Sequence, residues 1–210
     1  MRNIVLSKVL VFAGMLLLIM NSCKNEVSMD TKKLEQVWDR QEIEQLMYRH
    51  ARSLDRMDGE LMKSTYWPEG IEEHQDPIYP TLFHWNDNAH RFVPEAMKGF
   101  TNLKVTQHRI SNVLIELKGD NKATAETYVW AYHVHTDEND VDHEGILGGR
   151  HLFDLEKRGD EWKIMKRVTI FDWNQNQNAT AVWSDDYNDK YRPKRGDLKD
   201  ESYKFIKGIK

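Results

Sequence analysis

The strongest constraint on the fold is a pair of β-hairpins predicted in the second half of the chain. Residues 106–118 and 122–135 each alternate apolar and polar side chains, which is the pattern of a half-buried strand. Residues 146–157 and 161–173 form a second pair of the same kind. The predicted turns are Gly119-Asp120-Asn121 and Arg158-Gly159-Asp160. Two such hairpins predict an antiparallel sheet as the frame of the domain.

The first half of the expected domain has helical periodicity instead. Apolar side chains predict a helix over residues 32–56, with Asp30 or Thr31 as its N-cap. The recurring positions are Leu34, Trp38, Ile43, Leu46, Met47, Ala51 and Leu54. Residues 60–66 resemble a second short helix, and residues 71–90 resemble an irregular segment that could cover a pocket. Helices followed by antiparallel strands indicate an α+β fold, in which a long helix against a curved sheet would enclose a conical cavity.

The N-terminus predicts export. Arg2 and Lys8 precede an apolar run over residues 9–20, which is about as long as the core of a signal peptide. A membrane span needs about 20 apolar residues, so this run is short for one. Asn21-Ser22-Cys23 follows and resembles the lipobox of bacterial lipoproteins. We therefore expect lipidation of Cys23 and a location in the bacterial cell envelope, on the outer membrane or facing the periplasm. An ordinary signal peptide and an uncleaved anchor are the alternatives.

The expected organisation has four parts. They are a signal peptide over residues 1–22, a tether over 23–31, a domain over 32–178 and a polar extension over 179–210. Cys23 is the only cysteine, so the mature domain has no disulfide, thiolate metal site or cysteine nucleophile. Loss of the signal peptide removes two positive charges and takes the formal net charge from −4 to −6. This acidic balance argues against a nucleic-acid partner.

Titratable side chains gather at the ends of the expected elements. His108 begins one strand and His133 ends its hairpin partner, so the turn between them brings these ends together. Asp55 lies where the first helix stops, and His74 follows the helical half. A neutral histidine can take a proton from a carbon next to a carbonyl. A carboxylate on its second ring nitrogen fixes the tautomer and stabilises the imidazolium.

An elimination also needs a group that protonates or polarises the departing oxygen. The candidates are His133, His74, Tyr48 and Tyr66. Arg150 could hold an oxyanion or a carboxylate, or it could pair with Glu126 or Asp154. His74, His108 and His133 are the three histidines that could converge on zinc, but no metal and no cofactor is predicted, because His-x-x-x-His does not occur on the helices.

Three stretches resemble SnoaL-like proteins, a part of the nuclear transport factor 2-like superfamily. They are residues 52–58 (Arg-Ser-Leu-Asp-Arg-Met-Asp), residues 106–112 (Thr-Gln-His-Arg-Ile-Ser-Asn), and Gly149-Arg150 with residues 156–162 (Glu-Lys-Arg-Gly-Asp-Glu-Trp). The resemblance is greatest to the branch that includes scytalone dehydratase and hexachlorocyclohexane dehydrochlorinase. It implies a cone-shaped α+β barrel, in which N-terminal helices pack on a curved, mainly antiparallel sheet.

The resemblance also implies an Asp–His dyad. The aspartate at the helix end is Asp55 here, and the histidine of the Thr-x-His motif is His108. Counting along the hairpin puts the second active-site histidine of the dehydratase at His133 and its water-holding tyrosine near His74. The asparagine of the third strand becomes Arg150.

The predicted function is that of a cofactor-independent lyase of the dehydratase kind. It would remove a proton next to a carbonyl and expel water or another leaving group from a small molecule, such as a keto-sugar, a phenolic or a steroid. A ketosteroid-type isomerase and a non-catalytic small-molecule-binding module are the alternatives. The resemblance further implies a homodimer or a homotrimer.

Overall fold

The computed structural model describes residues 31–75, 84–181, 195–196, 200–206 and 208. The expected signal peptide and Cys23 lie outside these residues. The chain forms two compact units, Met1–Gln41 and Glu42–Lys210. In the first unit, residues 31–41 are helical, and Leu34, Val37 and Trp38 are exposed. Within the described ranges, no helix is long and apolar enough to cross a bilayer.

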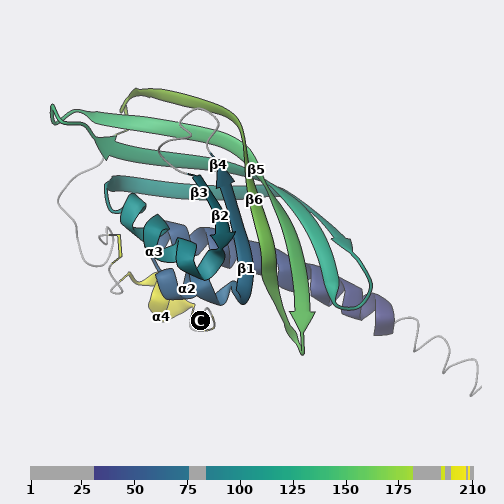
Figure 1. Ribbon diagram of the computed structural model, residues 1–210. Coiled ribbons are helices and arrows are strands. Elements are labelled where there is room, and N and C mark those ends of the chain that lie inside the picture. Colours follow the sequence, from purple (N-terminus) through teal and green to yellow (C-terminus); the bar gives the residue numbers. More distant parts are fainter. Residues whose placement is uncertain (1–30, 76–83, 182–194, 197–199, 207, 209–210) are drawn as a thin grey trace, which may run out of the picture. The chain divides into compact units, whose positions relative to one another are not determined.

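The second unit begins with the rest of the first helix, residues 42–56, and contains a six-stranded mixed sheet (Figure 1). The elements are α2 (Gly59–Ser64), β1 (Tyr66–Gln75), β2 (His84–Asn88), α3 (Ala89–Phe100), β3 (Leu103–Leu117), β4 (Lys122–Thr136), β5 (Asp142–Arg158), β6 (Glu161–Asn178) and α4 (Ser202–Phe205). The strand order is β2-β1-β6-β5-β4-β3. Only β1 and β6 pair in parallel among these strands, so the sheet is mainly antiparallel, and the predicted α+β class is confirmed.

Both predicted hairpins are confirmed. β3 pairs with β4, and β5 pairs with β6, each pair antiparallel. The register puts Thr106 opposite His133 and His108 opposite Ala131. The two histidines therefore reach the same end of the sheet, as the turn position predicts.

The region between the first helix and β3 differs from the prediction. The second helix is confirmed as α2, but the expectation of an irregular segment over residues 71–90 is wrong for its described part. That part forms β1, β2 and the start of α3, because β1 gains a parallel partner in β6 that is distant in sequence. α3 is not predicted from the sequence. Pro94 lies inside it, and proline is unfavourable in a helix interior.

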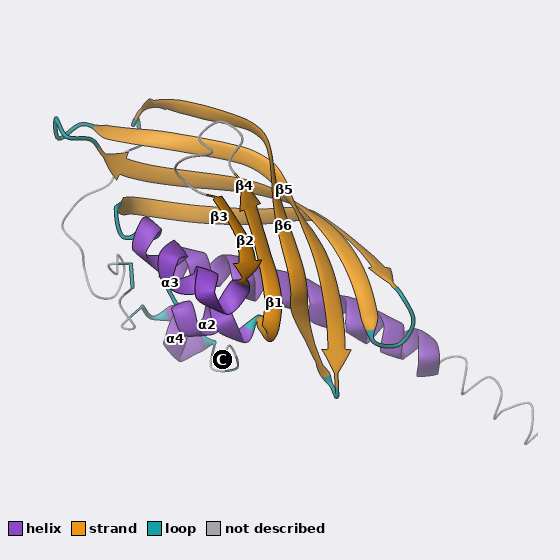
Figure 2. Cartoon of the chain, in the orientation of Figure 1, coloured by secondary structure: helices purple, strands orange, loops and turns teal. Residues whose placement is uncertain are grey.

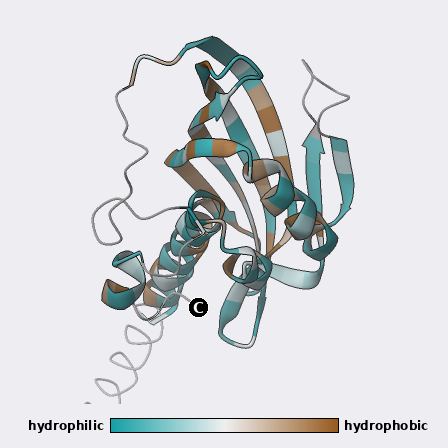
Figure 3. Ribbon diagram, turned by 90° about the vertical axis from the view of Figure 1, so that its left-hand side faces the viewer, coloured by the Kyte–Doolittle hydropathy of each residue, from teal (hydrophilic) through white to brown (hydrophobic). Residues whose placement is uncertain are grey.

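The core lies between the helices and one face of the sheet. Ile43, Leu46 and Met47 of the first helix share a buried cluster with sheet residues such as Phe153 and Ile164. Figure 2 shows α2 and α3 on that same face of the sheet. Hydrophobic and hydrophilic residues alternate along the strands in Figure 3. This alternation is what one covered face requires.

A sharp irregularity bends the sheet in the middle of β5. The pairing of β5 with β6 shifts register between Gly148 and Gly149. A Cβ atom on Gly149 would lie 2.2 Å from the carbonyl oxygen of Ile170 on β6, which no real side chain tolerates. Glycine at this bulge therefore allows the two backbones to approach closely.

Candidate active site

The end of the first helix fixes the position of Asp55. The backbone N–H of Asp58 donates to the carbonyl of Ser53 at 2.8 Å, and that of Met57 donates to Leu54 at 3.2 Å. Met57 has a left-handed φ of 53°. This is the Schellman motif, with methionine where glycine is usual. Asp55 thus lies in the last helical turn, on a backbone held by two further hydrogen bonds.

Asp55 and His108 form a hydrogen-bonded pair. Oδ1 of Asp55 lies 2.7 Å from Nδ1 of His108. The backbone N–H of His108 donates to both carboxylate oxygens, at 3.1 and 3.0 Å. The side chains are only 9 % exposed for His108 and 14 % for Asp55. A neutral His108 therefore carries its proton on Nδ1, where the carboxylate accepts it, and keeps a lone pair on Nε2.

His133 lies beside this pair. Its ring centroid is 5.3 Å from that of His108, and its Nδ1 is 2.8 Å from Oγ1 of Thr106. Burial, followed by the neighbouring His108 and Arg195, lowers the pKa of His133 to about 3. His133 is therefore neutral near pH 7, and Nε2 is the nitrogen that it offers to a ligand.

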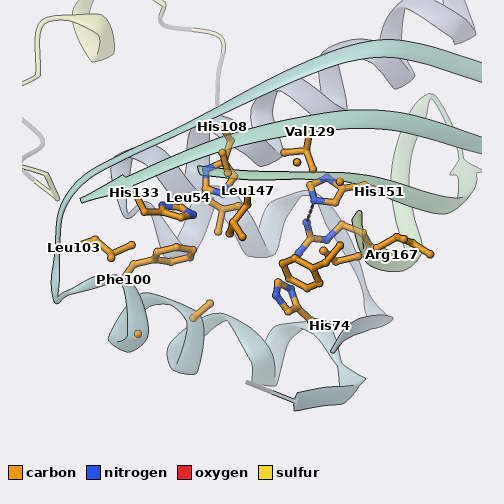
Figure 4. A pocket seen from close by; sticks show the side chains of 18 of the residues that line it. Leu54, His74, Phe100, Leu103, His108, Val129, His133, Leu147, His151 and Arg167 are labelled. Atoms are coloured by element: carbon orange, nitrogen blue, oxygen red, sulfur yellow. Dashed lines mark hydrogen bonds between the residues drawn. The ribbon is translucent and has the colours of Figure 1, made fainter. Parts of the chain in front are cut away.

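A cavity of about 280 Å³ extends from these two histidines along the inner face of the sheet (Figure 4). Its apolar wall includes Leu54, Phe92, Phe100, Val129, Leu147 and Phe171. Its polar lining residues are His74, His108, His133, His151, Arg167 and Thr169. Figure 4 shows His108 and His133 at one end and His74, His151 and Arg167 at the other. The cavity is thus apolar between two polar ends.

The second polar end is built on a buried ion pair. Arg167 donates to the two carboxylate oxygens of Glu72 at 2.6 and 2.8 Å, and these residues are 2 % and 0 % exposed. Burial by itself raises the pKa of Glu72, but Arg167 and His74 outweigh it and lower this pKa to about 2. Nη1 of Arg167 lies 3.3 Å from Nε2 of His151. Since a guanidinium only donates, His151 accepts there and is neutral.

The same end contains further polar groups that line the cavity. Burial, and then Arg167, holds the pKa of His151 well below its ordinary value. The hydroxyl of Thr169 is buried, and no hydrogen-bond partner lies within its reach among the residues that the structure describes. The ring of His74 packs against Phe171, with centroids 5.3 Å apart. The Glu72–Arg167 pair thus adds no net charge to this end, and His151 and Thr169 make it polar.

The structure brings His108, His133 and His74 to one cavity, with Asp55 behind His108, but does not bring the two predicted tyrosines there. Tyr66 is 1 % exposed, and its hydroxyl donates to Glu72 at 2.8 Å, so it is a further hydrogen-bond partner of the buried ion pair. Tyr48 is 39 % exposed and donates to Glu44 at 2.6 Å. Neither tyrosine lines the cavity.

Arg150 also lies away from the cavity. Its guanidinium donates to both carboxylate oxygens of Asp172 at 3.0 Å and reaches Glu126 at 3.5 Å. The reason is the alternation of side chains along a strand. His151 faces the cavity, so its neighbour Arg150 faces the opposite side of the sheet. The predicted pairing with Glu126 is confirmed, and the pocket-cation alternative is not supported.

Within the described ranges, no group of three or more His, Cys, Asp or Glu side chains has the arrangement of a metal site. His74, His108 and His133 share the cavity wall but do not converge as metal ligands would.

The sequence profile of the SnoaL-like domain matches residues 35–168. The chain belongs to the SnoaL-like domain family. A candidate scytalone dehydratase from Novosphingobium aromaticivorans has a similar fold, with a TM-score of 0.59 and 18% identity over 74% of this chain and 99% of that chain. Hexachlorocyclohexane dehydrochlorinase type 3 from Novosphingobium barchaimii has a TM-score of 0.61 and 12% identity, over 72% and 98% of the two chains. At such identities the likeness concerns the fold. No curated protein matches the sequence significantly.

Three polar groups of this SnoaL-like cavity were not predicted from the sequence. They are His151, Arg167 and Thr169. The sequence does contain a signal for His151, because it alternates with Phe153 and Leu155 along β5 and therefore faces the same, inner side of the sheet. Arg167 and Thr169 are two residues apart on β6 and therefore also face one side of the sheet. The ion pair to Glu72 needs the parallel pairing of β1 with β6, which no local pattern indicates.

Proposed function

We propose that this SnoaL-like protein is a cofactor-independent lyase that uses Asp55 and His108. The observation that carries the proposal is the 2.7 Å contact between Oδ1 of Asp55 and Nδ1 of His108, with the histidine lining a largely apolar cavity. A hydrogen-bonded carboxylate and imidazole in a site sheltered from water form a general base with a fixed tautomer.

The reaction would begin with proton transfer from carbon to Nε2 of His108. The C–H electron pair becomes the enolate, and the imidazolium that forms is stabilised by Asp55 through Nδ1–H. The enolate then collapses to a carbon–carbon double bond and expels the leaving group from the β carbon. The departing oxygen takes the proton back from the imidazolium. Nε2–H of neutral His133, beside His108, is the donor best suited to hold the enolate oxygen.

The lining favours a substrate with an apolar body and an oxygen function at each end. Burying several sugar hydroxyls against Phe92, Leu147 and Phe171 would leave them without partners, which is costly. A phenolic or steroid-like ketone fits this lining better than a keto-sugar. His74 and Thr169 would then receive the second oxygen, and the pairing of the Arg167 guanidinium with Glu72 favours a hydroxyl or a carbonyl there over a carboxylate.

An isomerase would use the same proton transfer and return the proton to another carbon. It would require a γ carbon within reach of His108, and it would lose no group. A binding module would have no use for the Asp55–His108 pair. The carboxylate on Nδ1, which is only 14 % exposed, therefore favours an enzyme over a binder.

The test is an absorbance assay of the mature chain. It is incubated with β-hydroxy and β-chloro ketones that carry aromatic or alicyclic bodies, and formation of the conjugated enone is followed. We expect turnover that His108→Ala abolishes. His135→Ala, which changes an exposed ring outside the cavity, should retain it. Equal turnover by the His108→Ala variant would refute the proposal, and tight binding without turnover would favour the binding module.

We also propose that the chain is exported and anchored to a bacterial membrane through lipid on Cys23. The support is the order of a basic start, an apolar run over residues 9–20 and Ser22-Cys23. Its substrate would then be a molecule met outside the cytoplasm. Assembly as a homodimer or homotrimer stays a prediction.

A further inference from the structure

The C-terminal segment returns to the helix end that carries Asp55. The segment has described residues at 195–196 and 200–206 and includes α4. It lies outside residues 35–168, the part that the family profile matches. Its contacts with the site are therefore an addition of this chain to the matched domain.

Arg195 joins two walls of the cavity. Its Nη1 donates to the carbonyls of Phe100 at 3.0 Å and Leu103 at 2.8 Å, and its Nη2 donates to the carbonyl of Leu54 at 3.4 Å. All three acceptor residues line the cavity. Leu54 directly precedes Asp55, whereas the other two residues lie at the end of α3 and the start of β3. A planar guanidinium can hold several oxygens at fixed angles, which a single point charge cannot.

Residues 200–206 hold the same helix end at further points. Nη2 of Arg52 donates to Oγ of Ser202 at 2.9 Å, and its guanidinium lies 4.9 Å from the ring centroid of Tyr203. The hydroxyl of Tyr203 donates to Asp58 at 3.1 Å. Asp58 is also the N-cap of α2, so one carboxylate joins α2 to the C-terminal segment.

An ion pair lies on the other side of Asp55 in sequence. Nε of Arg56 is 2.9 Å from Oδ2 of Asp200. Arg52, Leu54, Arg56 and Asp58 are thus all bound by the C-terminal segment, and Asp55 lies between them. Since a displacement of about 1 Å can cost a catalytic pair much of its rate, such bracing matters for function.

We propose that Arg195 is a positioning residue for the Asp55–His108 pair and that residues 200–206 fix the same helix end. Arg195 does not touch the reacting atoms. It acts by tying the backbone before Asp55 to the segment that leads into the strand of His108. The inference goes beyond the proposed function and does not depend on it, because the geometry of the pair can be measured without a substrate.

The experiment is histidine NMR on the full mature chain. The Nδ1–H of His108, bonded to a carboxylate, should give a far-downfield and slowly exchanging proton signal. Arg195→Met should remove or broaden that signal and raise the titration midpoint of His133 by about one pH unit, because a nearby cation is lost. Lys204→Met is the matched control. Lys204 is 68% exposed and pairs with Glu201, so this change should leave both readings as in the wild type.

Arg195→Lys separates geometry from charge. The lysine keeps the cation near His133 but not the planar fork, so the His133 midpoint should stay low while the His108 signal weakens. Circular dichroism reports the fold of each variant. If Arg195→Met does not fold, the lysine variant decides alone. A His108 signal of wild-type intensity in a folded Arg195→Met protein, or in Arg195→Lys where that variant decides alone, would overturn the proposal.

Discussion

Nδ1 of His108 lies 2.7 Å from Oδ1 of Asp55, and the backbone N–H of the same histidine donates to the same carboxylate. His108 thus binds the Asp55 carboxylate through both its ring and its backbone N–H. The ring orientation and the backbone position of His108 are therefore set together. A change at Asp55 should alter the tautomer of His108 more than its place in the strand.

Asp55→Asn tests this relation. The asparagine can still accept the backbone N–H of His108, so the free energy of unfolding should change by less than about 1 kcal/mol. Its amide cannot stabilise an imidazolium as a carboxylate does, and turnover should fall by roughly a hundredfold or more, as in triads where a misdirected tautomer costs about 10⁴. Enone formation measures the rate, and ¹⁵N chemical shifts report the tautomer. A variant as active as the wild type would show that the carboxylate has no catalytic part.

The Glu72–Arg167 pair should be a large contributor to stability that depends on both partners. Glu72→Gln leaves a buried guanidinium without its counter-charge, and we expect a loss of about 3–5 kcal/mol in urea unfolding. Arg167→Met should cost a similar amount. The double variant should lose clearly less than the two losses added together, because no unpaired charge is left.

Glu73→Gln serves as the control for this cycle. Glu73 is the next residue on β1 and pairs with Lys166 at 2.7 Å. The side chains of this pair are partly open to solvent, with 35% of Glu73 and 41% of Lys166 exposed. Surface pairs contribute at most about 1 kcal/mol. Additive losses in the Glu72 and Arg167 cycle would mean that the two residues do not act as a pair.

Stability should fall in mild acid because of His133. Its pKa is about 3 in the folded chain, against about 6.5 in an unfolded one. As the pH falls, His133 is therefore protonated in the unfolded chain at a higher pH than in the folded chain. Stability is complete above about pH 6.5 and is lost as the pH falls toward 3, at about 1.4 kcal/mol for each pH unit. His50 and His151, whose pKa values burial also lowers, act in the same direction.

His133→Gln should remove the contribution of this histidine to the pH dependence of the unfolding free energy. The slope of unfolding free energy against pH between 4 and 6, from urea midpoints, should become shallower than in the wild type. His135→Gln, at an exposed position on the same strand, should leave the slope unchanged. Equal slopes for all three proteins would contradict a neutral, buried His133.

The anchoring proposal predicts a change of compartment. Expressed in a bacterium that processes lipoproteins, the chain should sediment with membranes, and Cys23→Ala should release it or block its processing. Mass spectrometry of the mature N-terminus checks the modification. Recovery of unlipidated, freely soluble mature protein with Cys23 intact would exclude the anchor.

Local patterns predicted the parts of the site that depend on short-range geometry. The turn at residues 119–121 brings the far ends of β3 and β4 together, and a register shift between Ser111 and Leu114 then puts Thr106 opposite His133, so that His108 and His133 face the same side. A helix that ends near residue 56 places Asp55 at the rim of the sheet. The proximity of these residues follows from one turn and one helix end, whereas the shared face of the two histidines depends on the bulge in β3, which the alternation does not indicate.

The rest depends on long-range pairing and on parity. The sequence left Arg150 open between a cavity cation and a partner of Glu126 or Asp154, because strand alternation separates the two faces of β5 without indicating which of them faces the helices. Glu72 and Arg167 are paired only because β1 lies parallel to β6. Arg195 reaches the site from an extension whose polar composition carries no strand or helix period.

The bulge at Gly149 also limits which molecules the protein can accommodate. Any side chain at this position would press on the carbonyl of Ile170, so β5 and β6 would have to separate and the sheet would flatten. The part of the sheet that lines the cavity would then move, and the cavity would change in size although none of its histidines is substituted. Selection for larger or smaller compounds can therefore act through the main chain at Gly149, a lining residue without a side chain, while every side chain of the cavity wall is kept.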